Sequence, residues 1–109
     1  NFIQYGAWLR GMGPLPLIDI MRIDYSDYVI RKDIGAIQCP TLALAGAGEG
    51  DVMIRQAREY FDAAGSKVKR FHLFTLERDG SDDHCQLDNT TRAMQVIFDW
   101  LDEIFGMSA

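Results

Sequence analysis

The sequence predicts a mixed α/β fold in which two parallel strands are joined by a helix and followed by a second, longer helix. Thr41 to Ala45 form a short apolar run without alternation, as expected for a strand that is covered on both faces. Val68 to Leu76 form a second extended run. About 13 residues of helical pattern separate the runs, which is enough for the crossover that parallel strands need. The order predicted along the chain is helices, strand, helix, strand, loop and helix.

Residues 1 to about 32 are predicted to form short, irregular helices. Apolar side chains near the N-terminus share one helical face, with Trp8 beside it (Phe2, Tyr5, Gly6 and Leu9). Glycine and proline then interrupt the pattern (Gly11, Gly13, Pro14 and Pro16), and a second apolar set begins (Leu17, Ile18, Met21 and Tyr25). We expect these helices to pack on a sheet, and the lining of a substrate site is the alternative.

The first strand leads into a glycine-rich turn and an amphipathic helix. Pro40 suits the first position of a strand, where its missing N–H does little harm. Gly46 to Gly50 form the turn, and Asp51 is expected to cap the helix by accepting a hydrogen bond from a backbone N–H. Gly65 is expected to end this helix. Its apolar face is predicted to carry Ile54, Ala57, Phe61 and Ala64.

The last helix has the clearest pattern in the chain. Its apolar residues follow helical spacing without a gap (Met94, Ile97, Phe98, Leu101, Ile104 and Phe105). Asp88 or Asn89 is expected to cap its start, and Gly106 is expected to stop it. The residues between the second strand and this helix are polar and have no strand or helix period of their own.

The composition limits the class of protein. A chain of 109 residues is one domain at most, and 48% apolar with 25% charged residues is typical of a folded globular protein. The net charge of -5 argues against nucleic-acid binding. No apolar run approaches the ~20 residues of a membrane-spanning helix, and no signal peptide is recognisable. Cys39 and Cys85 are expected to be reduced thiols, and a cytoplasmic location is the default prediction.

Asp51 and His84 are the candidate catalytic residues. Each follows one of the two predicted strands, and the carboxyl ends of parallel strands meet at one edge of a sheet. A carboxylate that orients a histidine supplies two members of a nucleophile–base–orienter triad. The plainer interpretations are that Asp51 only caps a helix and that His84 is an exposed loop residue. Glu49 is a rival acid on the same turn, but it precedes the predicted helix start and can point to solvent.

Other polar residues in these loops are given structural interpretations. His72 is expected to be a packed or rim side chain of the second strand, and Cys85 a small buried thiol. A solvated loop accounts best for the acidic residues before the last helix (Asp79, Asp82, Asp83 and Asp88). A metal site formed by Asp82, His84 and Cys85 is a third alternative. Gly46-x-Gly48-x-Gly50 does not have the spacing of a dinucleotide fingerprint.

Two parts of the sequence resemble the α/β-hydrolase family. The first is similar to the family's seventh strand and the helix after it (Cys39-Pro40-Thr41-Leu42-Ala43-Leu44, Gly50-Asp51, Gln56-Ala57 and Tyr60-Phe61-Asp62). The second is similar to its histidine loop and terminal helix (Gly80-Ser81-Asp82-Asp83-His84-Cys85-Gln86 and Phe98-Asp99-Trp100-Leu101-Asp102-Glu103). Within the family, the likeness is to the branch of fermentation-switch-type esterases, pseudooxynicotine carbon–carbon hydrolases and polyketide-shortening hydrolases. It covers about Ile37 to Phe105.

The resemblance implies a division of the chain and a role for each candidate. Residues 1–36 would be the tail of a helical cap, and residues 37–109 the C-terminal part of an α/β-hydrolase core. Asp51 would be the triad acid and His84 the base, in an enzyme that cleaves an ester or a carbon–carbon bond of a carbonyl compound without metal or cofactor. The family orders its triad serine, acid, histidine, so the serine would lie upstream. The sequence contains no Gly-x-Ser-x-Gly, and the chain alone is therefore expected to be inactive.

The resemblance also predicts partners. In the family, the strand from Thr41 pairs with an earlier strand on its outer side, so its open edge here is expected to drive self-association or to require a companion chain. The substrate would be a small carbonyl or ester compound, with neither nucleic acid nor a membrane as partner. The alternative function is a non-catalytic α/β module that binds a partner or ligand through this open strand edge.

Overall fold

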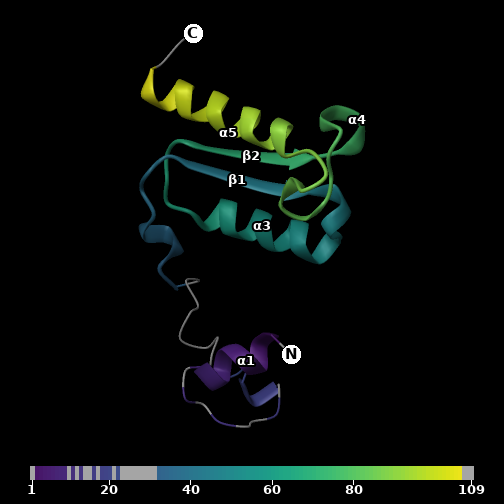
Figure 1. Ribbon diagram of the computed structural model, residues 1–109. Helices are drawn as coiled ribbons and strands as arrows, with labels where there is room; N and C mark the ends of the chain where they lie inside the picture. The colour runs from purple at the N-terminus through teal and green to yellow at the C-terminus, as the bar shows by residue number, and fades with distance from the viewer. Residues whose placement is uncertain are drawn as a thin grey trace. The chain divides into compact units, whose positions relative to one another are not determined.

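The computed structural model describes residues 2–9, 11, 13, 16, 18–20, 22 and 32–106 (Figure 1). The chain divides into two compact units, Asn1–Lys32 and Asp33–Ala109. The division predicted after residue 36 lies a few residues beyond this boundary. That the N-terminal residues are the tail of a helical cap stays a prediction.

The first unit contains α1 (Phe2–Leu9), where the first apolar face was predicted. Gly11 follows it with φ of 76°, and its N–H donates to the Trp8 carbonyl at 2.9 Å, which ends the helix as a left-handed glycine commonly does. Ile18 belongs to a second helical stretch that includes Asp19, Ile20 and Arg22. The other members of the second predicted apolar set (Leu17, Met21 and Tyr25) lie outside the described residues.

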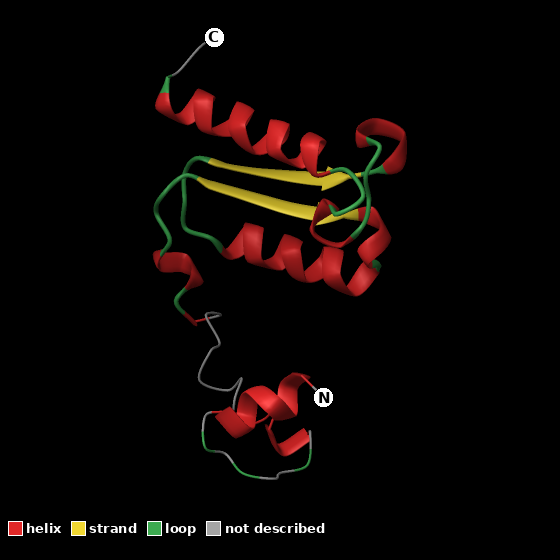
Figure 2. Cartoon of the chain, in the orientation of Figure 1, coloured by secondary structure: helices red, strands yellow, loops and turns green. Residues whose placement is uncertain are grey.

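The second unit is built on two parallel strands, β1 (Thr41–Gly46) and β2 (Lys69–Phe74). Their register runs from Thr41 beside Lys69 to Gly46 beside Phe74. The helix α3 (Asp51–Ala63) makes the crossover between them (Figure 2). The predicted mixed α/β class and the predicted order of these elements are confirmed.

The second strand is shorter than predicted. It was expected to reach Leu76, but Leu76–Asp79 forms the short helix α4. Thr75 starts this helix, because its Oγ1 accepts a hydrogen bond from the Arg78 N–H at 3.3 Å. A threonine at this position therefore acts as a helix cap and not as a further strand residue.

The strands form the middle layer of the unit, because α3 and α5 (Thr90–Phe105) lie on opposite sides of them (Figure 1). Consecutive side chains of β2 reach opposite helices, as the two-residue period of a strand requires. Phe71 packs edge to face against Phe61 of α3, with ring centroids 5.7 Å apart. Arg70 forms an ion pair with Glu103 of α5, with a shortest distance of 2.6 Å.

The core of this unit is small. Small side chains of β1, including Ala43 and Ala45, are buried, and so are Phe74 of β2 and Trp100 of α5. Half of the apolar set predicted for α5 remains exposed (Met94, Phe98 and Phe105). The pattern of α5 therefore predicted a helix correctly, but it overstated how much of that helix is covered.

Both ends of α5 agree with the sequence, whereas the start of α3 does not. Asn89 caps α5 by accepting from the Arg92 N–H at 3.2 Å, and Gly106 ends it with φ of 67°. Gly50, and not Asp51, occupies the cap position of α3, and Asp51 forms no side-chain cap. α3 ends at Ala63 with Ala64 as its C-cap, so it stops directly before Gly65, as predicted. A Cβ at Gly65 would lie 2.0 Å from the backbone oxygen of Gly35.

No helix in the described ranges combines the length and the apolar character that crossing a lipid bilayer would demand.

Candidate active site

The two loops that follow β1 and β2 meet at the carboxyl ends of the strands. The first contains the 3-10 helix η3 (Ala47–Glu49), and the second contains the 3-10 helix η4 (His84–Gln86). The Gly48 N–H donates to the Asp82 carbonyl at 2.9 Å and joins the two loops directly. The predicted meeting of the loops at one edge of the sheet is therefore observed.

Glycines in the first loop make this close approach feasible. A Cβ at Gly46 would lie 2.3 Å from the Asp82 carbonyl oxygen and 2.8 Å from that of Asp83. A Cβ at Gly48 would lie 2.9 Å from the same Asp82 oxygen. Since both distances at Gly46 are to backbone atoms, no side-chain movement could relieve them. The missing side chains of Gly46 and Gly48 therefore leave room for the backbone of the second loop.

His84 is paired with a carboxylate across this junction. Its Nδ1 lies 2.5 Å from Oε1 of Glu49, whose side chain is 13% exposed while that of His84 is 67% exposed. The other carboxylate oxygen of Glu49 accepts a hydrogen bond from the Gly46 N–H at 2.9 Å. Both oxygens of Glu49 are therefore engaged, one with its own turn and one with the histidine.

This environment keeps Glu49 ionised. The hydrogen bond from the Gly46 N–H lowers the pKa of Glu49 below its ordinary value, and the hydrogen bond and the charge of His84 lower it further, against the opposing effect of burial. An ionised carboxylate can only accept, so Nδ1 of His84 must donate the proton of this contact. In the neutral ring the proton thus sits on Nδ1, and Nε2 carries a lone pair. No described residue forms a hydrogen bond with Nε2 of His84.

Asp51 is not the residue that contacts His84. It is the exposed first residue of α3, and between these two described side chains there is neither a hydrogen bond nor an ion pair. Glu49 was set aside as a residue that can point to solvent, but its side chain is 13% exposed and contacts His84. The expected Asp51–His84 contact is absent, and a catalytic role for Asp51 stays a prediction. The spacing of Gly46 and Glu49 was the available signal, because a glutamate three residues on can reach back to a backbone N–H.

The backbone at His84 has an uncommon conformation. The two residues that follow it are both left-handed, Cys85 with φ of 54° and Gln86 with φ of 53°. For residues with a Cβ this costs roughly 1–2 kcal/mol each, and such costs concentrate at functional sites. The thiol of Cys85 is free and exposed, so its predicted burial is wrong. The Cys85 side chain therefore lies at the surface and not in the core.

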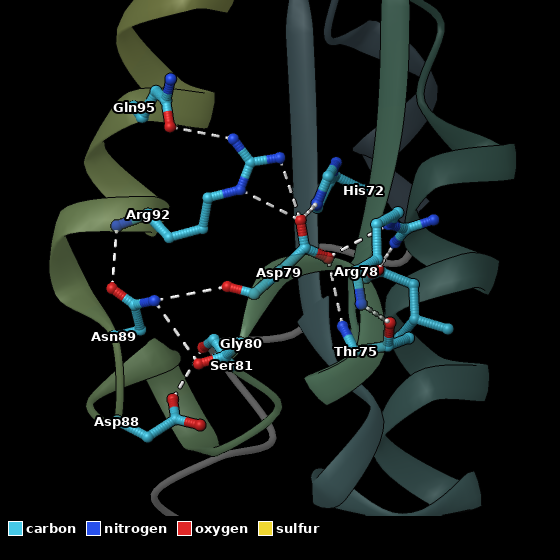
Figure 3. Close-up of polar contacts among 11 residues, drawn as sticks. His72, Thr75, Arg78, Asp79, Gly80, Ser81, Asp88, Asn89, Arg92 and Gln95 are labelled. Carbon is cyan, nitrogen blue, oxygen red and sulfur yellow. Dashed lines mark hydrogen bonds and ion pairs between the residues drawn. The ribbon is translucent and has the colours of Figure 1, made fainter.

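A second histidine–carboxylate pair, His72 with Asp79, lies between β2 and α5 (Figure 3). Asp79, at the end of α4, has a side chain with no solvent exposure. One of its oxygens, Oδ1, lies 3.2 Å from Nε2 of His72 and accepts from Arg92 at 3.1 Å. The other accepts from the Thr75 N–H at 3.2 Å and from Arg78 at 3.1 Å. The prediction that Asp79 belongs to a solvated acidic loop is therefore wrong.

Asp79 serves as the centre of a structural network. Burial alone would raise its pKa, but the hydrogen bonds from Thr75, Arg78 and Arg92 and the charge of His72 together hold the pKa of Asp79 at about 2. His72 is mostly buried, as a strand residue was expected to be, and its Nε2 faces this carboxylate. Both oxygens of Asp79 are shared with arginines, and the side chain of His72 is only 19% exposed, against 67% for His84, so a substrate would reach His72 less easily. Of the two histidines, His84 is the better candidate.

Among the residues that the structure describes, no group of three or more His, Cys, Asp or Glu side chains is arranged to hold a metal ion. The alternative site at Asp82, His84 and Cys85 is thus not formed.

The chain matches no protein-family model, no curated protein and no solved structure.

Proposed function

We propose that this chain is the C-terminal part of a serine-type hydrolase of the α/β class, acting on an ester or a carbon–carbon bond of a carbonyl compound. The observation that supports the proposal is the contact of 2.5 Å between Glu49 and His84 across the carboxyl ends of two parallel strands. A carboxylate on Nδ1 fixes the tautomer that leaves Nε2 unprotonated, as the base of such a triad requires.

Each residue then has a distinct chemical task. Nε2 of His84 takes the proton of a serine hydroxyl as that oxygen attacks the carbonyl, and later returns the proton to the leaving group. Glu49 stabilises the imidazolium that forms in between. A water molecule must then reach the acyl intermediate to release the product. The sequence contains no Gly-x-Ser-x-Gly, so in this proposal the serine is supplied by residues outside these 109.

Two carboxylates compete for the role of triad acid. The family resemblance implies Asp51, which begins α3, and the geometry favours Glu49, which contacts His84. A carboxylate without a hydrogen bond to Nδ1 does not select the tautomer of the histidine. We therefore propose Glu49 as the orienting acid.

The test compares three variants in a protein that carries both this chain and the nucleophile. Hydrolysis of p-nitrophenyl esters is measured as kcat/KM. His84→Ala is expected to lower kcat/KM by about 10³-fold or more, because base and nucleophile act as a unit. Glu49→Gln is expected to cause a loss of about 10²-fold or more, since it retains shape but removes the charge. Asp51→Asn is the matched control and is expected to change kcat/KM by less than about tenfold.

The outcomes separate the alternatives. A large loss for Asp51→Asn with little for Glu49→Gln would return the acid role to Asp51 and leave the hydrolase intact. Activity that survives His84→Ala would overturn the proposal and favour a non-catalytic module. The 109-residue chain alone is expected to show no turnover, and a cytoplasmic location belongs to the same proposal.

A further inference from the structure

The loop that carries His84 is organised around a carboxylate that does not touch the histidine. Oδ1 of Asp88 accepts a hydrogen bond from the Ser81 hydroxyl at 2.7 Å. Oδ2 accepts from the backbone N–H groups of Asp82 at 2.9 Å and Asp83 at 3.4 Å. These three donors are the three residues that directly precede His84. The side chain of Asp88 thus binds all three residues of the segment that leads into His84.

Both backbone polar groups of Asp82 form hydrogen bonds. Its N–H donates to Asp88, and its carbonyl accepts from the Gly48 N–H at 2.9 Å. Gly48 directly precedes Glu49 in the chain. A short path of contacts therefore leads from Asp88, through the backbone of Asp82, to the turn that carries Glu49, the partner of His84.

The histidine needs a restraint of this kind. Asp83 caps the His84 N–H through its own Oδ1 at 2.7 Å, but that contact is local and fixes only the adjacent backbone. The left-handed Cys85 and Gln86 follow immediately, so the local conformation alone does not favour the observed turn. Most of the His84 side chain is exposed, which leaves few packing contacts to orient it.

We propose that Asp88 is a positioning residue, whose carboxylate holds residues 81–83 so that the His84 imidazole meets Glu49. The inference deepens the proposed function and rests on it. Asp88 itself does not take part in proton transfer. It acts through the backbone that sets where His84 lies.

The charge of Asp88 fits this task. The hydrogen bond from Ser81 lowers the pKa of Asp88 below its ordinary value, and the N–H of Asp82 lowers it further, so the carboxylate stays ionised near neutral pH. A competing role exists, because Asp88 directly precedes Asn89, the cap of α5. A negative charge there would also stabilise the helix through its dipole. The experiment must therefore report on His84 and not only on stability.

The readout is the tautomer of His84 in the 109-residue chain, measured by the ¹⁵N chemical shifts of its neutral imidazole ring. His84→Ala assigns the signal, because His72 is the chain's only other histidine. In the wild type we expect the proton mainly on Nδ1. Asp88→Asn is expected to make this tautomer the minor species. Asp99→Asn, the loss of one exposed charge on α5, is the matched control and is expected to leave the tautomer unchanged.

A Glu49→Gln variant separates failure of this inference from failure of the proposed function. If the wild type lacks the Nδ1 proton, or Glu49→Gln leaves the tautomer unaltered, the pairing of Glu49 with His84 fails and so does the proposed function. If both behave as expected but Asp88→Asn keeps the wild-type tautomer, only the role of Asp88 is overturned. Should Asp88→Asn not fold, as judged by circular dichroism, Ser81→Ala decides. A shift in the same direction supports the role, and an unchanged tautomer overturns it.

Discussion

At the scale of single residues, Asp79 shows how hydrogen bonds can outweigh burial. An isolated buried carboxylate would be neutral, because desolvation disfavours its charge. Here backbone and arginine donors surround it, and its pKa is about 2 against an ordinary 3.8. The charge therefore persists in the core, where it links α4, β2 and α5 (Figure 3).

Replacing Asp79 with Asn is expected to lower the free energy of unfolding at pH 7 by about 3 kcal/mol, because Arg92 and Arg78 would lose their shared partner. Urea denaturation followed by circular dichroism measures this change. The exposed Asp99→Asn serves as control and is expected to stay within about 0.5 kcal/mol of the wild type. An Asp79→Asn variant as stable as the wild type would show that the network contributes little.

The same residue predicts an acid dependence of stability. The folded-state pKa lies below the ordinary value, so the contribution of Asp79 is complete above pH 3.8 and is lost as the pH falls toward 2. One pKa unit corresponds to about 1.4 kcal/mol, and the difference between 3.8 and about 2 therefore amounts to about 2 kcal/mol. Over this window the wild type is expected to lose about 2 kcal/mol more than Asp79→Asn. Equal acid slopes for the two proteins would contradict the assignment.

At the scale of elements, the site depends on how closely two loops can dock. Gly46→Ala would place a Cβ against the backbone oxygens of Asp82 and Asp83, although its φ of -98° suits alanine. The expected result is an outward shift of the histidine loop, loss of the Nδ1 tautomer of His84 and a destabilisation of about 1–3 kcal/mol. Gly35→Ala is the matched control, because a Cβ there finds its nearest atom at 4.0 Å. If Gly46→Ala retains the wild-type tautomer and stability, close docking does not position the histidine.

The elements that the sequence predicted well have a strong local signal. Asn89 and Gly106 mark the ends of α5 through caps that depend only on neighbouring residues. β1 was recognisable because a strand between two helices needs apolar residues on both faces. The fold class followed from these elements and their order.

What the sequence did not reveal depends on contacts between loops. Glu49 looked exposed because its partner, His84, is 35 positions away in the chain. Asp79 was predicted to be solvated because other acidic residues follow it in the sequence. The short helix α4, which the sequence did not predict, brings its carboxylate to Arg92. Asp51 was predicted as a cap because aspartate is favoured there, but Gly50 takes the position with φ of 85°. In each case a tertiary contact or a backbone angle overrode a local preference.

At the scale of the whole molecule, the second unit has a strand edge and apolar side chains that none of its described residues covers. β1 pairs with β2 along one edge, and no other strand of the described chain pairs with its opposite edge. On α5, Phe98 is 58% exposed and Phe105 is 70% exposed. Free strand edges and exposed apolar side chains are both typical of surfaces that associate.

We therefore expect the purified chain to self-associate in a concentration-dependent way, with the outer edge of β1 and the apolar face of α5 buried in the assembly. Light scattering over a dilution series measures the mass, and hydrogen exchange of β1 amides tests whether they gain protection as the concentration rises. Phe98→Glu places a charge on this face and is expected to shift the midpoint of association to at least tenfold higher concentration, a cost of about 1.4 kcal/mol. Thr91→Glu adds the same charge at an exposed position of the first turn of α5 and serves as control. The expectation fails if the chain is a stable monomer at every concentration and its β1 amides exchange equally throughout. The β1 edge would then be stable when exposed to water, and the chain would need no second copy to remain folded.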